Sequence, residues 1–217
     1  MTDPTYTDIT MVLDRSGSMQ SIKTDTIGGF DAFISEQREL PGRCVVSLVQ
    51  FDNEYEEVYT GRPIAEVPSL TLVPRGSTAM LDAIGRAVNA TGARLAALPE
   101  DQRPGAVIVG IMTDGLENAS REFSYPTIKT LIEQQEQTYG WTFMYMGANQ
   151  DAIEVGASLG VARDRSLTYA GPKVAAAMGA YSASVGTIRK AVAAGAPVEQ
   201  ARRRAAYSDE QRRKATD

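Results

Sequence analysis

The sequence predicts an α/β fold with a doubly wound, mostly parallel central sheet, one antiparallel edge strand and helices on both faces. The first observation is that short β-rich apolar runs alternate along the chain with longer segments of helical periodicity. The second is the run AVIVGIMT at residues 106–113, which is apolar throughout, as is typical of a central strand covered on both faces. The third is a length of 217 residues with 43% hydrophobic and 23% charged residues, enough for a large core without disulfides.

Four buried strands and one edge strand are predicted from the apolar runs and the turn residues between them. The edge strand, over residues 56–60, follows a turn at Asp52 and Asn53 and is expected to be antiparallel. The buried strands are expected over residues 9–13, 44–51, 106–113 and 141–146.

Helices are predicted where apolar residues recur at helical spacing between these strands. The first ends at Pro41-Gly42, and the segment 61–77 is expected to be a loop because it holds three prolines. The expected helices cover residues 19–40, 80–98, 126–139 and 152–159.

The chain beyond residue 170 has a different pattern, so we expect one domain over residues 1–170 and a C-terminal helix with a polar tail over 171–217. This second part either packs on the domain or extends from it. Six apolar residues in the helix are spaced 4, 3, 4, 3 and 4 apart. They indicate a last helix packed on the sheet or a docking helix for a partner. Residues 197–217 carry six basic and four acidic residues and are expected to form a solvated helix or a frayed end. The six spaced residues are Val174, Met178, Tyr181, Val185, Ile188 and Val192.

The composition excludes several classes of site. The chain has no histidine, so a Ser-His-Asp triad and a histidine-ligated zinc are excluded, and one cysteine, Cys44, permits neither an internal disulfide nor a cysteine-cluster metal site. A net charge of −5 argues against a nucleic-acid partner. The start of the chain lacks a signal-peptide pattern and no apolar run is long enough to span a bilayer, so we expect a soluble, cytoplasmic protein with no membrane partner.

Small hydroxyls and carboxylates gather in three segments that follow predicted strands or precede predicted helices. These are residues 14–18 (Asp-Arg-Ser-Gly-Ser), 76–78 (Gly-Ser-Thr) and 113–115 (Thr-Asp-Gly). In the predicted fold all three lie at one edge of the sheet. Each segment alone is also ordinary helix-cap and turn chemistry. Together, their oxygen atoms suit Mg²⁺ or Mn²⁺, which prefer oxygen ligands.

Three stretches of the sequence resemble the von Willebrand factor A (VWA) family and its metal-ion-dependent adhesion site. They are DITMVLDRSGSM, RGSTAMLDAIG and VGIMTDGLENAS, and the resemblance covers roughly residues 8–169. The chain looks most like the compact single-domain bacterial or phage members.

The resemblance implies a non-enzymatic protein-interaction module that depends on a divalent cation. In it, the hydroxyls of Ser16, Ser18 and Thr78 would contact the metal, and Asp14 and Asp114 would do so directly or through water. All five positions match the family pattern. The implied cofactor is Mg²⁺, with Mn²⁺ or Ca²⁺ possible, and the implied partner is a protein that supplies a Glu or Asp to the metal.

Two alternatives come from other functional classes. A Mg²⁺-dependent phosphohydrolase of the haloacid-dehalogenase type also places an aspartate after the first strand, but it needs a second carboxylate two residues later, where this chain has Ser16. A metal-independent scaffold could assemble through the C-terminal helix. Dinucleotide binding is disfavoured because Gly17 is the only glycine between Asp14 and Gly28.

Residues around the three segments have two interpretations each. Arg15 either selects an acidic ligand or is solvated, and Asp82 either favours the dipole of its helix or binds the metal. Glu117 and Asn118 either line the metal face or are exposed loop residues. Asp52 and Asn53 support the site or form a turn, and Asn149 caps a helix or belongs to the rim of the binding site. For Cys44 we expect a buried small hydrophobic residue.

Overall fold

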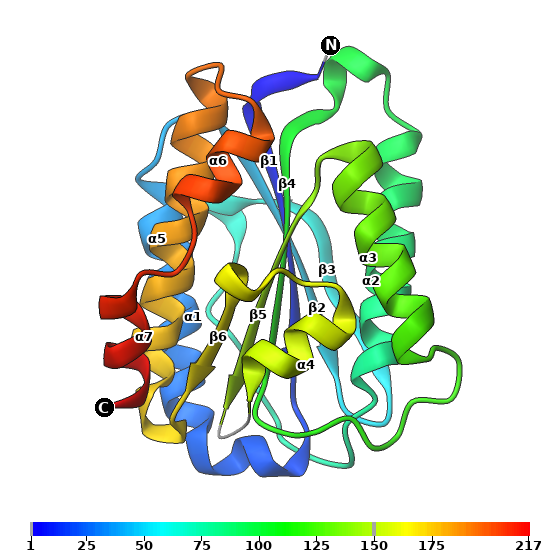
Figure 1. The fold of residues 1–217 in the computed structure, drawn as a ribbon, viewed down its shortest axis with the longest axis vertical. Coiled ribbons are helices and arrows are strands. Elements are labelled where there is room, and N and C mark those ends of the chain that lie inside the picture. Colours follow the sequence, from blue (N-terminus) through cyan, green and yellow to red (C-terminus); the bar gives the residue numbers. More distant parts are fainter. Residues whose placement is uncertain (1, 149–150) are drawn as a thin grey trace.

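The structure of the protein is a computed structural model that describes residues 2–148 and 151–217. It contains a six-stranded sheet in the order β3-β2-β1-β4-β5-β6, in which β2 and β3 pair antiparallel and the other neighbours pair parallel (Figure 1). The predicted fold class is therefore confirmed. The strands are β1 (Asp3–Asp14), β2 (Arg43–Phe51), β3 (Tyr55–Pro63), β4 (Pro104–Thr113), β5 (Thr142–Ala148) and β6 (Ser166–Tyr169).

Helices cover both faces of the sheet and produce two separate apolar cores (Figure 1). Helices α1 and α5 close one core, and α2, α3 and α4 close the other. Across the described ranges, we find no helix whose length and apolar character would let it traverse a bilayer. The helices are α1 (Lys23–Arg38), α2 (Met80–Ala96), α3 (Tyr125–Tyr139), α4 (Ala152–Leu159), α5 (Val174–Ala193), α6 (Val198–Arg204) and α7 (Asp209–Thr216).

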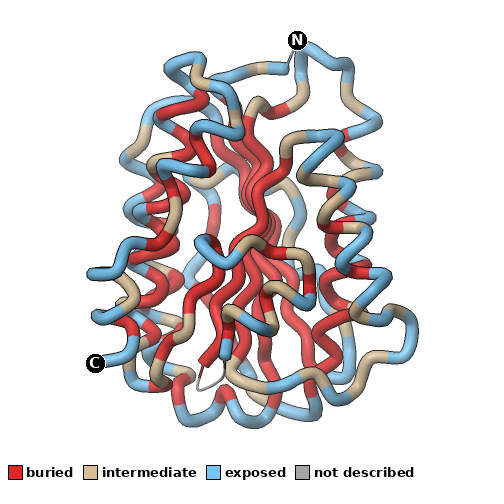
Figure 2. Tube along the Cα trace, viewed as in Figure 1, coloured by how far each residue is buried: buried red, intermediate tan, exposed pale blue. Residues whose placement is uncertain are grey.

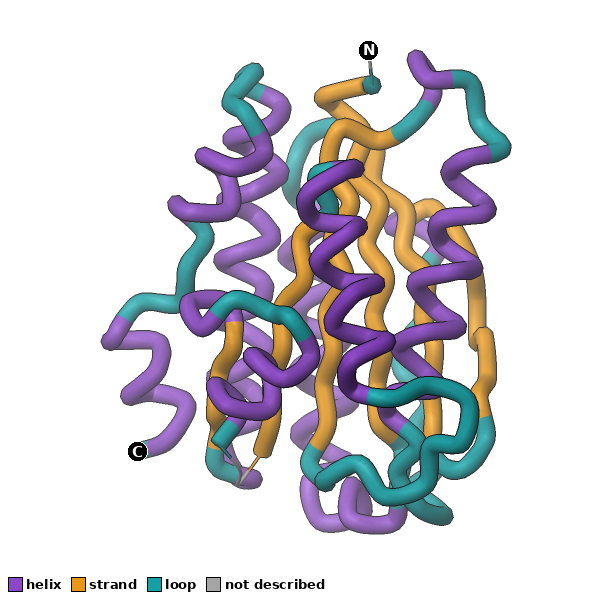
Figure 3. The backbone as a smooth tube through the Cα atoms, turned by 45° about the vertical axis from the view of Figure 1, so that its right-hand side comes forward, coloured by secondary structure: helices purple, strands orange, loops and turns teal. Residues whose placement is uncertain are grey.

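The parallel strands end together at one edge of the sheet. The last residue of β1, Asp14, pairs with Phe51 of β2, and on the other side Leu13 pairs with Met112 of β4. The loops that follow these strands gather at the lower end of the molecule in Figure 3. Because this edge collects the carboxyl ends of β1, β2 and β4, it brings sequence-distant loops within reach of one another.

Strand β6 is an element that the sequence pattern did not predict. Its four residues, Ser-Leu-Thr-Tyr, pair parallel with β5 and are largely buried. A strand this short, half of it polar, shows neither a clear apolar run nor enough alternation to be distinguished from a loop.

Helix α5 packs on the sheet, so the docking-helix interpretation of its spaced apolar residues is wrong. All six lie in the core between α5, α1 and the sheet, and the most exposed of them, Val192, is only 5% exposed. Figure 2 shows this inner side of α5 as buried. The apolar face through which a scaffold would assemble is therefore already covered by the chain itself.

The polar tail is not a solvated or frayed end, contrary to expectation. Helices α6 and α7 pack against α5, and Ala201, Tyr207 and Ala215 are buried there. The backbone N–H of Ala170 also donates to the carbonyl of Ala215. The hydropathy of the tail did not indicate this packing, because its buried face is formed by small alanines and one tyrosine and not by large aliphatic residues.

Candidate metal-binding site

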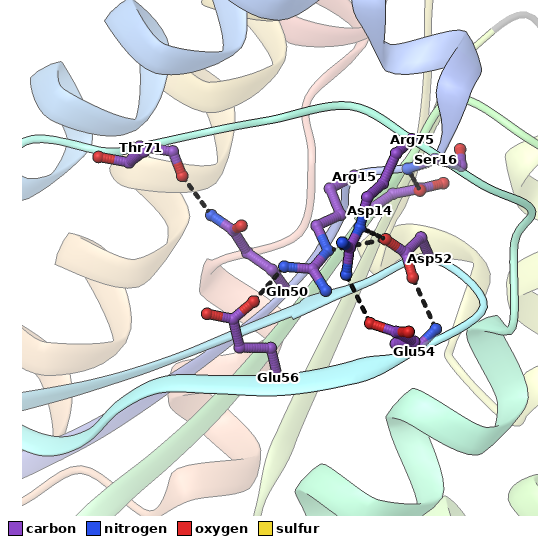
Figure 4. Close-up of polar contacts among 9 residues, drawn as sticks. All are labelled: Asp14, Arg15, Ser16, Gln50, Asp52, Glu54, Glu56, Thr71 and Arg75. Atoms are coloured by element: carbon purple, nitrogen blue, oxygen red, sulfur yellow. Dashed lines mark hydrogen bonds and ion pairs between the residues drawn. The ribbon is translucent and has the colours of Figure 1, made fainter.

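Asp14 ends β1 at the sheet edge with its carboxylate completely buried. Its Oδ1 accepts a hydrogen bond of 2.6 Å from the backbone N–H of Ser16, which Figure 4 shows beside it. Its Oδ2 accepts a bond of 2.5 Å from the hydroxyl of Thr113, at the end of β4. The aspartate therefore joins the first of the three polar segments to the third.

The five predicted residues meet at this edge. Ser16 Oγ lies 3.1 Å from Ser18 Oγ, and the Ser18 hydroxyl donates a bond of 2.6 Å to Asp114 Oδ1. The third hydroxyl, that of Thr78, is located by its distance from Gly115. A Cβ atom placed on it would lie 3.2 Å from Thr78 Oγ1, 3.6 Å from Ser18 Oγ and 3.9 Å from Ser16 Oγ. Three hydroxyls thus surround one point. We call Asp14, Ser16, Ser18, Thr78 and Asp114 the strand-end cluster.

The two carboxylates of the strand-end cluster lie in an environment that disfavours their charge. Burial raises the pKa of Asp14 to about 6, against the opposing effect of the hydrogen bonds from Thr113 and Ser16. Burial also raises the pKa of Asp114, although the hydroxyl of Ser18 partly offsets this. A bound divalent cation would favour the ionised form of both groups.

The donor set fits a hard cation. Three hydroxyls and two carboxylates offer only oxygen atoms, which is the ligand chemistry of Mg²⁺, Mn²⁺ and Ca²⁺. In the described parts of the chain, no group of three or more His, Cys, Asp or Glu residues is arranged to hold a metal. A divalent cation at this edge would therefore depend on the hydroxyls as much as on the two acids.

Thr78 is held by Asn118, a role that the sequence pattern did not predict. The backbone N–H of Thr78 donates to Asn118 Oδ1 at 2.9 Å, and the backbone N–H of Asn118 donates to the Thr78 carbonyl at 3.0 Å. Glu117 accepts bonds from the N–H of Leu81 and from Ser120, so it caps α2 instead of lining the metal face. Both residues lie in the loop after β4, where Asn118 is exposed as expected and Glu117 is half-buried, and each makes hydrogen bonds to the start of α2 or to Thr78.

Asp82 lies in the first turn of α2, where an acidic side chain favours the helix dipole as predicted, and it also makes contacts that were not predicted. Its carboxylate accepts hydrogen bonds of 2.8 to 2.9 Å from three consecutive backbone N–H groups, those of Arg121, Glu122 and Phe123. The loop after β4 is thus fastened to the start of α2 from both sides, because Glu117 accepts from α2 in return. Favourable interaction with the helix dipole is a secondary effect beside these bonds.

Arg15 neither selects a ligand nor lies in solvent. It is 6% exposed, its Nε donates to Asp52 Oδ2 at 3.0 Å, and a second ion pair joins it to Glu56 (Figure 4). Asp52 is completely buried and also pairs with Arg75 at 2.8 Å. Burial alone would raise the pKa of Asp52, but the hydrogen bond from Arg75, the N–H of Glu54 and the charge of Arg15 hold it below its ordinary value.

Two further predictions concern the residues around β2 and α4. Cys44 is buried, as expected. The predicted helix cap Asn149 lies outside the described residues. Asp151 caps α4 in the structure, since its side chain accepts from the N–H groups of Ile153 and Glu154.

Comparison with known proteins identifies the fold as that of VWA domains. No family model matches the sequence, and no curated protein matches it. Among solved structures, the von Willebrand factor domain of the type V pili tip protein Mfa5 from Porphyromonas gingivalis is 14% identical with a TM-score of 0.58. The match covers 82% of this chain and 94% of that one. At this level of identity the similarity establishes the fold.

Two larger proteins contain a similar domain. The pilus adhesin SpaC from Lactobacillus rhamnosus GG, in its open conformation, is 13% identical with a TM-score of 0.63, over 83% of this chain and 30% of SpaC. Proximal thread matrix protein 1 from the mussel byssus, with a zinc-occupied MIDAS motif, is 16% identical with a TM-score of 0.56. That match covers 86% of this chain and 46% of the mussel protein, so the present chain corresponds to less than half of either protein.

Proposed function

We propose that this protein is a non-enzymatic protein-interaction module that depends on a divalent cation bound by the strand-end cluster. The observation that carries the proposal is the convergence of three hydroxyls around Gly115, with Asp14 and Asp114 beside them. Mg²⁺ is the expected cation, with Mn²⁺ or Ca²⁺ as substitutes. The similarity to a domain whose MIDAS motif holds zinc supports a divalent cation, and the similarity to pilus proteins supports a protein partner.

The chemistry of the cluster suits an acidic ligand. Ser16, Ser18 and Thr78 would contact the cation through neutral hydroxyls, with Asp14 and Asp114 acting directly or through water. Two carboxylates and three neutral donors leave the cation electrophilic, so it would bind a Glu or Asp side chain of the partner. The protein's own task is to hold the hydroxyls: Asp14 fixes the backbone of Ser16, and Asn118 fixes that of Thr78.

The phosphohydrolase alternative fits the site less well. A phosphohydrolase of this type needs a nucleophilic aspartate together with a second carboxylate two residues later. Ser16 occupies the position where that chemistry needs a proton-transferring carboxylate, and a hydroxyl does not titrate near neutral pH. The non-enzymatic proposal is therefore favoured.

Calorimetric titration of the purified protein with Mg²⁺, Mn²⁺ and Ca²⁺ tests cation binding. We expect binding by the wild type and none by Asp14→Ala, with the circular dichroism spectrum unchanged. Ser77→Ala is the matched control, since Ser77 is the exposed hydroxyl next to Thr78 and makes no contact within the strand-end cluster. Absence of binding by the wild type, or equal binding by Asp14→Ala, would contradict the proposal.

The interaction itself is tested by affinity capture in Mg²⁺ and in EDTA. A partner retained only with Mg²⁺ is then altered at each acidic residue, Asp→Asn and Glu→Gln, one at a time. We expect one such change to abolish capture. The proposal of a partner carboxylate fails if capture persists through every one of these changes.

A further inference from the structure

Thr78 belongs to a long irregular segment, residues 67–79, that contains neither helix nor strand. A segment of this kind has no regular backbone ladder to fix it, so its position depends on individual contacts. Gln50 Nε2 donates to the carbonyl of Thr71 at 2.7 Å, and the N–H of Gly17 donates to the carbonyl of Gly76 at 3.2 Å. The location of Thr78 relative to Ser16 and Ser18 is thus set by such contacts.

Asp52, just after β2, accepts several of these contacts at once, through both its side chain and its backbone carbonyl. Its Oδ2 accepts from Arg15 Nε at 3.0 Å and from Arg75 Nε at 2.8 Å, and its Oδ1 accepts from the N–H of Glu54 at 2.6 Å (Figure 4). Its backbone carbonyl accepts from the N–H of Ala79 at 2.8 Å. One buried residue therefore bonds both polar segments next to the cation site.

The sequence positions of these partners connect Asp52 to the strand-end cluster. Arg15 lies between Asp14 and Ser16, and Ala79 follows Thr78 directly. The two segments are also joined to each other, because the N–H of Arg75 donates to the carbonyl of Arg15 at 2.8 Å. The side chain of Asp52 thus connects the segment of the two serines, through Arg15, with the segment of Thr78, through Arg75.

We propose that Asp52 is a positioning residue for the cation site, which sets the separation between Thr78 and the Ser16–Ser18 turn through its shared bonds to Arg15 and Arg75. This inference rests on the proposed function of the strand-end cluster. Asp52 does not itself bind the cation. Substitution of a residue that orients metal ligands in this way typically lowers metal affinity about 10- to 100-fold.

The charge of Asp52 is part of this role. The side chain of Arg15 is 8% exposed, and its other partner, Glu56, is 53% exposed. A buried guanidinium without a buried carboxylate is strongly disfavoured, so Arg15 would shift toward solvent if Asp52 became neutral. Because Arg15 is the residue between Asp14 and Ser16, a shift of Arg15 would displace these two members of the strand-end cluster.

The test compares Mg²⁺ affinity by calorimetry for the wild type, Asp52→Asn, Arg75→Gln and Asp8→Asn. Asp8 is a matched control: it is completely buried and pairs with Arg94 at 2.7 Å, but it lies inside β1, away from the cluster. We expect Asp52→Asn to weaken Mg²⁺ binding about 10- to 100-fold. Asp8→Asn should lower stability and leave the affinity unchanged.

Arg75→Gln separates positioning from simple electrostatics. Removing a positive charge near the site should strengthen cation binding if only charge matters, especially at low ionic strength. Loss of the bond from Arg75 to Asp52, which holds the Thr78 segment, should instead weaken cation binding. Weaker binding is the result we expect. Arg75 is 54% exposed, so this variant retains the buried Asp52–Arg15 pair and tests the inference even if Asp52→Asn fails to fold.

The outcomes distinguish this inference from the proposed function. If the wild type binds Mg²⁺ and Asp14→Ala does not, but Asp52→Asn binds like the wild type, the positioning role of Asp52 is wrong and the cation site stands. Tighter binding by Arg75→Gln, or equal losses in Asp52→Asn and Asp8→Asn, also overturns it. A wild type that binds no divalent cation overturns both proposals.

Discussion

Asn118 and Thr78 are joined by two hydrogen bonds that run in opposite directions. The side-chain oxygen of Asn118 accepts from the backbone N–H of Thr78, and the backbone N–H of Asn118 donates to the carbonyl of Thr78. The pair has the reciprocal hydrogen bonds of two residues in neighbouring strands, but here one of the two bonds is made by an amide side chain and both residues lie in loops. It ties the loop after β4 to the residue that supplies the third hydroxyl of the strand-end cluster.

Asn118→Ala should therefore weaken both the fold and the cation site. The N–H of Thr78 loses its acceptor, which costs about 1 kcal/mol of unfolding free energy, and Thr78 becomes free to move away from Ser16 and Ser18. Urea denaturation measures the first effect and Mg²⁺ titration the second. Ser77→Ala is the control. Unchanged Mg²⁺ affinity in Asn118→Ala would show that Thr78 needs no such support.

Gly115→Ala should abolish cation binding without unfolding the protein. Gly115 does not have a positive φ, so alanine is compatible with its backbone, but the added methyl would lie 3.2 Å from Thr78 Oγ1 and close to both serine hydroxyls. The methyl therefore occupies the space that the cation needs. Calorimetric titration with Mg²⁺ and thermal unfolding check the two halves of the prediction.

Gly28→Ala provides the matched control. Gly28 lies exposed in α1, and a Cβ there would meet no atom within 4 Å. Alanine at this helix position should raise the unfolding free energy by about 0.5–1 kcal/mol and leave Mg²⁺ affinity unchanged. If Gly115→Ala still binds Mg²⁺ as tightly as Gly28→Ala, the cation does not sit above Gly115.

Asp82 should make stability depend on pH in the acid range. Burial raises the pKa of Asp82, but the three backbone N–H groups it accepts from outweigh this and hold it below its ordinary value of 3.8. A lowered folded-state pKa gives stability that is present above about pH 4 and lost as the pH falls through the folded-state value. The free-energy difference between the wild type and Asp82→Asn should be constant from about pH 5 to 7 and shrink below about pH 4.

The measurement is urea denaturation of both proteins across this pH range. Asp25→Asn serves as a control, since Asp25 is an exposed acid in the first turn of α1. A difference between the wild type and Asp82→Asn that stays constant down to about pH 2 would contradict the prediction.

Tyr181→Phe should stabilise the protein. Tyr181 lies on the inner face of α5 and is completely buried, and its hydroxyl has no hydrogen-bond partner among the described residues. Removing an unsatisfied buried hydroxyl should raise the unfolding free energy by about 1 kcal/mol. Tyr181→Asp, in contrast, would place a charge in this core and should unfold the domain. A loss of stability in Tyr181→Phe would reveal a partner for the hydroxyl.

The parts of this molecule that sequence could predict are those whose signal is local. The central strand β4 is apolar throughout, and the end of α4 is marked by Gly160, which has a positive φ. The three segments that contain the strand-end cluster follow a strand or precede a helix at one edge, and the resemblance to the VWA family implied the five residues within them. The structure brings them together, and their cation binding stays a prediction.

The parts that could not be predicted depend on contacts between distant residues. Arg15 is buried against the carboxylate of Asp52, 37 positions later, and no pattern around Arg15 indicates this contact. Asn118 reaches Thr78 across 40 positions in the same way. In the tail, Arg202 and Ala201 pack where hydropathy indicated solvent, since that burial depends on Glu136 and α5.

The direction of β1 has a practical consequence for studying this protein. The strand runs twelve residues from Asp3 to Asp14, about 40 Å in extended backbone, so its two ends lie at opposite poles of the molecule. A tether or dye attached beside Asp3 would leave the opposite pole pointing into solution. Immobilisation at that end is thus the orientation in which a sensor chip keeps the hydroxyl-rich pole open to an incoming protein.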